Sequence, residues 1–351
     1  MRKILLFFII FGISLMISSC QNEPIQYSDD QPFVLEMKDE TLKILQITDL
    51  HLTYGYDYRD QKTLRLIEAL STYDDYDLIV ISGDLTMSPS APRLFKQIIS
   101  LMEGLKTPWT FIFGNHENDY HSYEDFLSII PKTDYLYFKV GPMIDQGGVG
   151  NFHFTFTKDG TPFYRLYLID SKAEAPSLED ADFEYDYLSL GQVNWYRDHV
   201  EDDQVDSIVF MHIPLIQYNL ATDIVGTFGE DRVYSQGMDT GFFDAMVEFG
   251  KSKALFVGHD HLNDFYFMLE GIMLAYGRAT GYNGYGTLEK GGRHIEISDS
   301  GELSTYLISE SEVLSWPKNR SFYQRFIHLS GEFWECFSLI QCGFSLFHCL
   351  F

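Results

Sequence analysis

Cysteine is scarce in this sequence, with 4 in 351 residues, and three of these lie near the end as Cys336, Cys342 and Cys349. The main body therefore has no internal disulfide, and its stability must come from core packing. Basic residues are scarce too, because 25 Lys and Arg stand against 51 Asp and Glu, giving a formal charge of -26. This balance excludes a protein that coats nucleic acid through a basic face.

Two common catalytic or phosphate-binding motifs are missing as well. The sequence has no Gly-x-Ser-x-Gly elbow of a serine hydrolase. The glycine-rich stretch at residues 276–286 lacks the Gly-Lys-Ser/Thr ending of a P-loop, so we interpret it as tight turns beside a site. With 45% hydrophobic and 22% charged residues, the composition is that of a folded globular protein and excludes disorder as the main state.

The N-terminus has the order of an export signal. Arg2 and Lys3 precede a 14-residue apolar run at residues 4–17, which is shorter than the roughly 20 residues needed to cross a bilayer. The ending Ile17-Ser18-Ser19-Cys20 resembles a bacterial lipobox. We therefore expect a signal peptide at residues 1–19, lipidation of Cys20 and a polar tether to residue 40. The alternative is ordinary secretion with a chance cysteine. Lipidation would give an exported bacterial lipoprotein facing the periplasm or the cell exterior.

From residue 41 to 310, short apolar runs alternate with segments of helical period, which predicts one layered α/β domain. The predicted buried strands are residues 42–48, 77–82, 108–113, 163–170, 207–212 and 254–258. The predicted helices are residues 62–70, 91–105, 122–130, 190–200 and 240–250. Four shorter runs, at 264–269, 272–277, 293–297 and 302–308, are expected to be antiparallel strands that close a second sheet. The tail at 311–351 is either a peripheral apolar flap or a segment unrelated to the catalytic fold.

Five of the six buried strands are followed by residues that bind metals. These residues form the blocks Asp49-Leu50-His51, Gly83-Asp84, Gly114-Asn115-His116-Glu117, His212 and Gly258-His259-Asp260-His261. Each block alone is weak evidence, but strand ends are where ligands collect in α/β sheets, and five blocks in this order are hard to obtain by chance. Imidazole with carboxylate and amide oxygen suits Zn, Fe, Mn or Ni better than Ca.

The blocks resemble those of the calcineurin-like metallophosphoesterase superfamily over roughly residues 42 to 300, and the local sequence resembles its purple-acid-phosphatase-like branch. The resemblance implies a four-layer α/β/β/α sandwich of two mixed sheets flanked by helices. It also implies two divalent or trivalent metal ions. Asp49, His51 and His261 would hold the first ion, and Asn115, His212 and His259 the second. Asp84 would bridge them.

The same resemblance makes His116 a catalytic residue that meets the substrate phosphate and assists the leaving oxygen. Purple enzymes carry a tyrosine three residues after the bridging aspartate, and calcineurin-type members place there an aspartate that orients the catalytic histidine. This sequence has Met87 at that position. A coloured iron-tyrosinate centre is therefore not expected, and Glu117 or Asp119 are the candidates to orient His116.

We therefore expect an extracytoplasmic phosphoesterase in which metal-bound hydroxide attacks a small phosphorylated substrate. Phosphomonoesters are the favoured class, and phosphodiesters or cyclic nucleotides are the alternative. A catalytically idle binding lipoprotein with the same fold is the alternative outside enzymes. The membrane would be a partner only through the lipid anchor. Asp170 is assigned a structural or substrate-side role. His121 is interpreted as a surface or ordinary hydrogen-bonding residue that is close enough to the third block to line the cleft. The acidic stretch at residues 174–187 is interpreted as a solvated loop, and the sharper hypothesis is that it borders the cleft.

Overall fold

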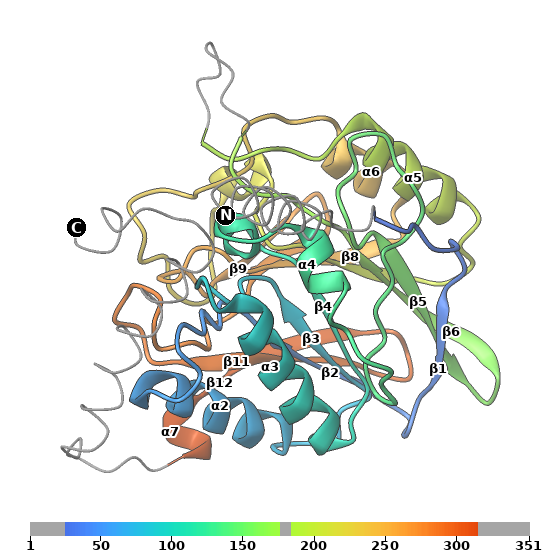
Figure 1. The fold of residues 1–351 in the computed structure, drawn as a ribbon. Helices are drawn as coiled ribbons and strands as arrows, with labels where there is room; N and C mark the ends of the chain where they lie inside the picture. The colour runs from blue at the N-terminus through green and yellow to red at the C-terminus, as the bar shows by residue number, and fades with distance from the viewer. Residues whose placement is uncertain (1–24, 176–183, 315–351) are drawn as a thin grey trace, which may run out of the picture.

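The computed structural model describes residues 25–175 and 184–314. Two β-sheets lie face to face between two layers of helices (Figure 1). The five-stranded sheet has the spatial order β12 (Leu303–Ser309), β11 (Gly291–Ile297), β2 (Leu42–Ile47), β3 (Leu78–Ser82) and β4 (Trp109–Ile112). The seven-stranded sheet has the order β1 (Phe33–Glu36), β5 (Phe152–Lys158), β6 (Thr161–Leu168), β7 (Ser207–Phe210), β8 (Ser252–Val257), β10 (Ile272–Tyr276) and β9 (Tyr266–Leu269).

The helices divide between the outer faces of the two sheets (Figure 1). Those on the five-stranded sheet are α2 (Tyr58–Ser71), α3 (Ala91–Leu105), α4 (Tyr123–Leu127) and α7 (Glu310–Val313). Those on the seven-stranded sheet are α5 (Leu190–Glu201) and α6 (Phe242–Phe249). Short 3-10 helices, η1 (His116–Asp119) and η2 (Ile216–Leu220), follow β4 and β7. The expected four-layer α/β/β/α sandwich is confirmed.

Strand periodicity explains why both faces of each sheet are buried. Along β3, Leu78 and Val80 point into the layer between the sheets, whereas Ile79 and Ile81 point toward α2 and α3. Successive side chains on a strand alternate between faces, so a continuous apolar run fills two layers at once. The continuous apolar runs in the sequence therefore report a sheet covered on both sides.

The direction of the central strands determines where the loops meet. β2, β3 and β4 run parallel to one another, and β6, β7, β8 and β10 do the same in the other sheet. The carboxyl ends of parallel strands share one edge, where ligands bind in α/β sheets. The loops after β2, β3, β4, β7 and β8 consequently meet at one end of the sandwich.

The pairing of the last four strands differs from the expectation. β11 and β12 extend the five-stranded sheet beside β2, but β9 and β10 belong to the seven-stranded sheet, in which β10 runs parallel to β8. The prediction that all four close a single second sheet is therefore wrong. Short strands carry no sequence signal that names a partner far along the chain.

Two segments outside the expected body belong to the folded part. β1, at residues 33–36, pairs with β5 although it lies within the predicted tether. In α7, just inside the predicted tail, the Glu310 carboxylate contacts Lys62 at 3.7 Å and the hydroxyl of Tyr282. The ordered body therefore extends beyond residues 41–310 at both ends.

The predicted signal peptide, Cys20 and most of the predicted tail lie outside the described residues. Within residues 25–175 and 184–314, every helix is too short or too polar to cross a bilayer.

Candidate metal centre

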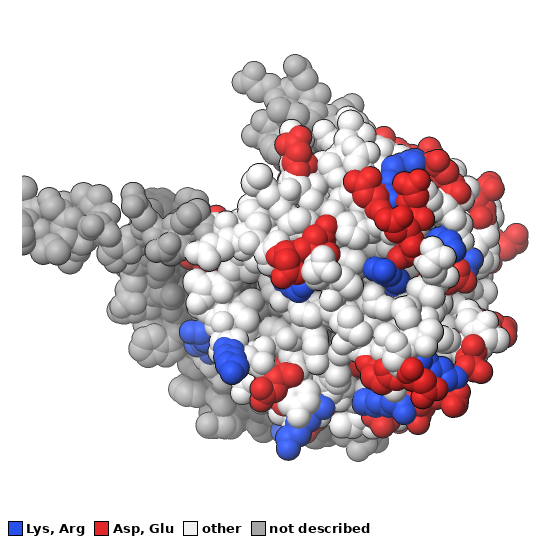
Figure 2. Space-filling model, turned by 90° about the vertical axis from the view of Figure 1, so that its right-hand side faces the viewer, with Lys and Arg blue, Asp and Glu red and all other residues white. Residues whose placement is uncertain are grey.

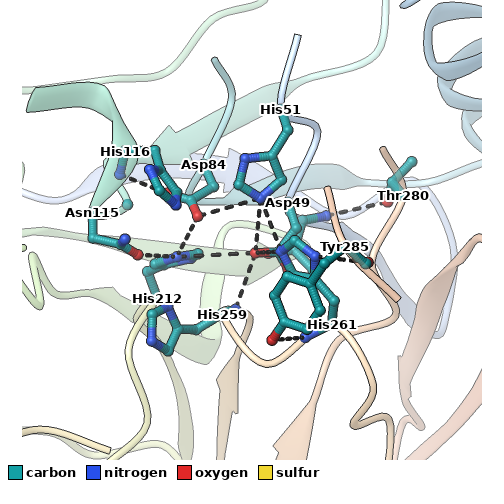
Figure 3. A network of polar contacts seen from close by, with 12 residues as sticks. Asp49, His51, Asp84, Asn115, His116, His212, His259, His261, Thr280 and Tyr285 are labelled. Atoms are coloured by element: carbon teal, nitrogen blue, oxygen red, sulfur yellow. Dashed lines mark hydrogen bonds and ion pairs between the residues drawn. The ribbon is translucent and has the colours of Figure 1, made fainter. Parts of the chain in front are cut away.

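Loops from both sheets bring the predicted site residues together (Figure 3). Ligand atoms of Asp49, His51, Asp84 and His261 all lie within 4.8 Å of one another, and so do those of Asp84, His212 and His259. All six residues are buried. Asp84 belongs to both groups, which is the arrangement expected of a carboxylate that bridges two ions.

One oxygen of Asp84 faces both groups. Its Oδ2 lies 3.5 Å from Nε2 of His51 and 3.2 Å from Nε2 of His212. Its Oδ1 instead accepts a hydrogen bond of 3.0 Å from the backbone N–H of His116. The two oxygens therefore have separate tasks, since one is held by the loop after β4 and the other is presented to the two histidines.

Asp49 has the matching position in the first group. Its Oδ1 lies 3.4 Å from Nε2 of His261 and 4.0 Å from Nε2 of His51. The two imidazole nitrogens are themselves only 2.9 Å apart. The same Oδ1 accepts a hydrogen bond from the backbone N–H of His259, so one carboxylate ties the loop after β2 to the loop after β8.

The second group gains an amide oxygen from Asn115. Its Oδ1 lies 3.2 Å from Nε2 of His212, while its Nδ2 donates a hydrogen bond of 3.3 Å to Glu174. This contact determines which way the amide faces, so its oxygen points at the histidine. Glu174 lies in the acidic stretch at 174–187, where the sequence pattern gave no reason to single it out.

Backbone carbonyls hold the orientation of two of the histidine rings. His212 donates Nδ1–H to the carbonyl of Ser82 at 2.8 Å, and His261 donates Nδ1–H to the carbonyl of Tyr285 at 3.1 Å. With Nδ1 held in this way, Nε2 of His212 faces the carboxylate of Asp84 and Nε2 of His261 faces that of Asp49. A metal ion between them satisfies both partners, and a histidine held by a backbone carbonyl is the usual metal ligand. The donor set therefore fits two transition-metal ions.

Burial and the two aspartates shift the pKa values of the cluster in opposite directions. Burial opposes protonation of His212, but the charge of Asp84 outweighs it and raises the pKa of His212 to about 10. Burial lowers the pKa of His51 to about 3, and burial together with the charge of His212 lowers the pKa of His259 to about 3. Burial also opposes ionisation of Asp84, yet the charge of His212 holds the pKa of Asp84 well below its usual range.

The backbone is strained at this edge. Asp49, His51, Asp84 and His259 all have positive φ, between 45° and 77°. Non-glycine residues rarely adopt this region, and such strain collects at functional sites. Gly83 has φ +98° and a Cβ there would lie 2.3 Å from the His212 ring, while a Cβ on Gly284 would lie 2.3 Å from Cε1 of His261. Side chains at either position would displace a histidine.

His116 is held by Asp119. Nδ1 of His116 lies 2.8 Å from Oδ2 of Asp119, one turn along η1. The other candidate, Glu117, is buried and instead accepts hydrogen bonds from the backbone N–H groups of Thr86 and Gly114. Burial opposes protonation of His116, but the hydrogen bond that it donates to Asp119 and the charge of Asp84 raise the pKa of His116 to about 9.

A cavity of about 390 Å³ opens onto the cluster. His51, Asp84, Asn115, His116, His259 and His261 line it, together with Met87, Tyr185, Glu230, Tyr234, Asp260, Asn283, Gly284 and Tyr285. Tyr185 places part of the acidic stretch at the cavity, as expected. Glu230 and Tyr234 lie in loops without a motif and were not predicted. Tyr285 lies in the glycine-rich stretch at 276–286, which was expected beside a site, but nothing in that stretch singled out this tyrosine.

Two other residues that the sequence singled out lie elsewhere. His121 is not among the residues that line the cavity, and its Nε2 contacts the carbonyl of Pro89 at 2.7 Å. Asp170 is buried and accepts hydrogen bonds from the backbone N–H groups of Val149 and Lys172, which is a structural role.

Comparison with known proteins gives distant relatives. The chain is 27% identical over 292 residues to "Probable inactive purple acid phosphatase 14" of Arabidopsis thaliana, covering 71% of this chain and 72% of that protein. It is 25% identical over 274 residues to "Phosphatase DCR2" of Saccharomyces cerevisiae, covering 66% of this chain and 46% of that protein.

A solved structure shows the same fold. The crystal structure of a dimetal phosphatase from Danio rerio aligns with a TM-score of 0.53 at 12% identity, covering 77% of this chain and 99% of that one. Residues 42–263 match the family described as "Calcineurin-like phosphoesterase". Because this match spans more than half of the chain and contains the whole cluster, the chain belongs to the calcineurin-like phosphoesterase family, with purple acid phosphatase-like proteins as distant homologues.

Proposed function

We propose that this metallophosphoesterase hydrolyses phosphomonoesters outside the cytoplasm. The observation that carries the reaction is the position of Asp84, whose Oδ2 faces histidines of both ligand groups beside a cavity that His116 also lines. Asp49, His51 and His261 would hold one ion and Asn115, His212 and His259 the other, with Asp84 shared. Two such ions, when bound, lower the pKa of a water molecule and neutralise charge on the phosphoryl oxygens.

His116 and Asp119 supply the proton chemistry of the proposal. Asp119 holds Nδ1 of His116, so Nε2 is the nitrogen left to meet the substrate in the cavity. A protonated imidazole can give its proton to the oxygen of the departing alcohol as the ester bond breaks. The raised pKa of His116 keeps this proton available near neutral pH.

Some relatives of this chain have names that call them inactive. An idle binding protein is therefore the alternative to an enzyme. The complete set of buried donors favours the enzyme, because binding alone does not require six further ligands around the shared carboxylate of Asp84.

Metal-free protein reconstituted separately with Mn, Zn, Fe and Ni tests the reaction. We expect about two ions per chain in metal analysis and faster turnover of an aryl phosphate than of a bis-aryl phosphate or a cyclic nucleotide. The variant Asp84→Asn should be inactive. Asp159→Asn, the same substitution at an exposed turn, should retain full activity. Metal loading without turnover of any ester would instead support the idle protein, and a preference for the diesters would reverse the proposed substrate class.

We also propose export and lipid anchoring through Cys20, which rests on the N-terminal sequence alone. Cells fed a labelled fatty acid should label the protein, and Cys20→Ser should abolish the label and release the protein from the membrane fraction. Label that persists in the Cys20→Ser variant would contradict the assignment.

A further inference from the structure

Beyond the candidate metal ligands, the walls of the cavity carry acidic and aromatic side chains and no basic side chain among the described residues. Among the described residues that line it, none is a lysine or an arginine, while Glu230 and Asp260 are acidic and Tyr185, Tyr234 and Tyr285 are aromatic. The chain as a whole carries a formal charge of -26, and on the face shown in Figure 2 acidic side chains form several clusters. A substrate with a second anionic group would therefore meet repulsion both on approach and at the wall.

Glu230 is a fixed negative charge in this wall. Its Oε1 accepts hydrogen bonds from the hydroxyl of Tyr285 at 2.6 Å and from the backbone N–H of Leu262 at 3.0 Å. Its Oε2 accepts no hydrogen bond from the residues that the structure describes. One oxygen thus holds the carboxylate in place and the other remains available to a ligand.

Tyr285 connects this carboxylate to the candidate metal centre. Its ring stacks on His261, with centroids 4.2 Å apart and planes at 14°, and its carbonyl accepts the Nδ1–H of the same histidine. Figure 3 shows the ring lying beside His261. Glu230 is therefore one side chain away from a candidate ligand, on the wall of the same cavity.

The other two tyrosines add aromatic surface. The Tyr185 ring meets the edge of His259 at 4.5 Å and 89°. The Tyr234 ring already takes a cation on one face, since Arg232 lies 4.5 Å from its centroid while paired with Glu184. Aromatic faces combined with a carboxylate are the usual surroundings of bound ammonium groups.

We propose that the natural substrate is a phosphate ester of an amino alcohol, whose positively charged nitrogen is bound by Glu230 and the tyrosines Tyr185, Tyr234 and Tyr285. This inference rests on the proposed function for the phosphate end. Hydrolysis would join the oxygen of water to phosphorus, break the ester P–O bond and release the amino alcohol with a proton on its oxygen.

A pair of isosteric esters tests the role of charge on the metal-loaded protein. Phosphocholine and 3,3-dimethylbutyl phosphate have the same shape and differ only in the charge of the terminal group. We expect kcat/KM to be about tenfold higher for phosphocholine, and 2-phosphoglycolate, which adds a carboxylate, to be the poorest of the three. Equal values for the isosteres, or a preference for the neutral one, would overturn the proposal.

Two variants assign the effect to a residue. Glu230→Gln keeps the size of the side chain and should reduce the ratio between the two isosteres well below tenfold, to the part that the tyrosines supply. The control Glu248→Gln removes an exposed carboxylate of α6 that pairs with Arg197 of α5, and it should leave the ratio unchanged. An unchanged ratio in a folded Glu230→Gln protein, checked by circular dichroism, would show that Glu230 does not bind the cation.

Binding of the alcohol alone separates this inference from the proposed function. In NMR titrations of zinc-loaded protein, choline should bind about tenfold more tightly than 3,3-dimethylbutanol, and Glu230→Gln should reduce the difference. If choline binds in this way but no ester is hydrolysed, the cation site stands and the proposed function fails. If esters are hydrolysed but the two alcohols bind equally, the function stands and the cation site fails.

Discussion

Replacing Asp119 tests whether it positions His116. Their side chains are 27% and 31% exposed and joined at 2.8 Å, and a hydrogen bond between charged groups is worth about 1.5–3 kcal/mol. Partial exposure places this one at the lower end, and each 1.36 kcal/mol corresponds to about tenfold in rate. We expect Asp119→Ala to reduce kcat about tenfold. Asp119→Asn should lose only part of this, because a neutral hydrogen bond is roughly half as strong.

The assay is turnover of an aryl phosphate at saturating substrate, with metal content measured on the same samples. Metal content should not change, because Asp119 contacts His116 and not the ligand cluster. In a His116→Ala background, Asp119→Ala should have almost no further effect, since two residues that act as a unit are not additive. The reasoning is refuted if Asp119→Ala loses metal, or if it slows the His116→Ala protein by the same factor.

Three further predictions concern the metal centre. Asp84→Asn should reduce the occupancy of both ions, whereas His116→Ala should lower kcat with near-normal metal content; equal metal loss in the two variants would contradict this division of roles. Chelation should lower the melting temperature, because an ion at 100 times its dissociation constant adds about 2.7 kcal/mol to the free energy of unfolding. Each kcal/mol shifts the melting temperature of a domain of this size by about 2–4 °C. Thermal melts with and without chelator measure the shift, and an unchanged midpoint would mean that the cluster binds no metal. Gly284→Ala should displace His261 and reduce metal content, whereas Gly104→Ala, with nothing within 4 Å of its added Cβ, should not. Metal analysis measures both variants, and equal metal content in the two would contradict the prediction.

The position of the candidate site could be predicted from the sequence where residues of metal-binding type directly follow a buried strand. Asp84 and His212 come directly after apolar runs, and parallel strands place such residues at a common edge, so the position of the cluster could be predicted without coordinates. The helices predicted at 91–105 and 190–200 could be recognised because their apolar residues recur with helical period.

What the sequence left open depends on local turn geometry or on distant pairing. Asp119 could not be chosen over Glu117 until η1 showed that the third residue, and not the next one, lies beside the His116 ring. β1 is only four residues long, and its place is determined by β5, more than a hundred residues away. Glu230 is held at the cavity wall by hydrogen bonds that its carboxylate accepts from Leu262 and Tyr285. No pattern in the sequence predicts such contacts.

The candidate ligands are divided between the two sheets. Asp49, His51, Asp84 and Asn115 follow strands of one sheet, and His212, His259 and His261 follow strands of the other. Neither half of the sandwich alone offers a complete coordination sphere, so a nascent or half-assembled chain cannot retain a pair of ions. Catalytic competence should therefore arise only when the two halves have closed on each other, which would keep a newly made chain from attacking cellular phosphate esters before it is fully folded.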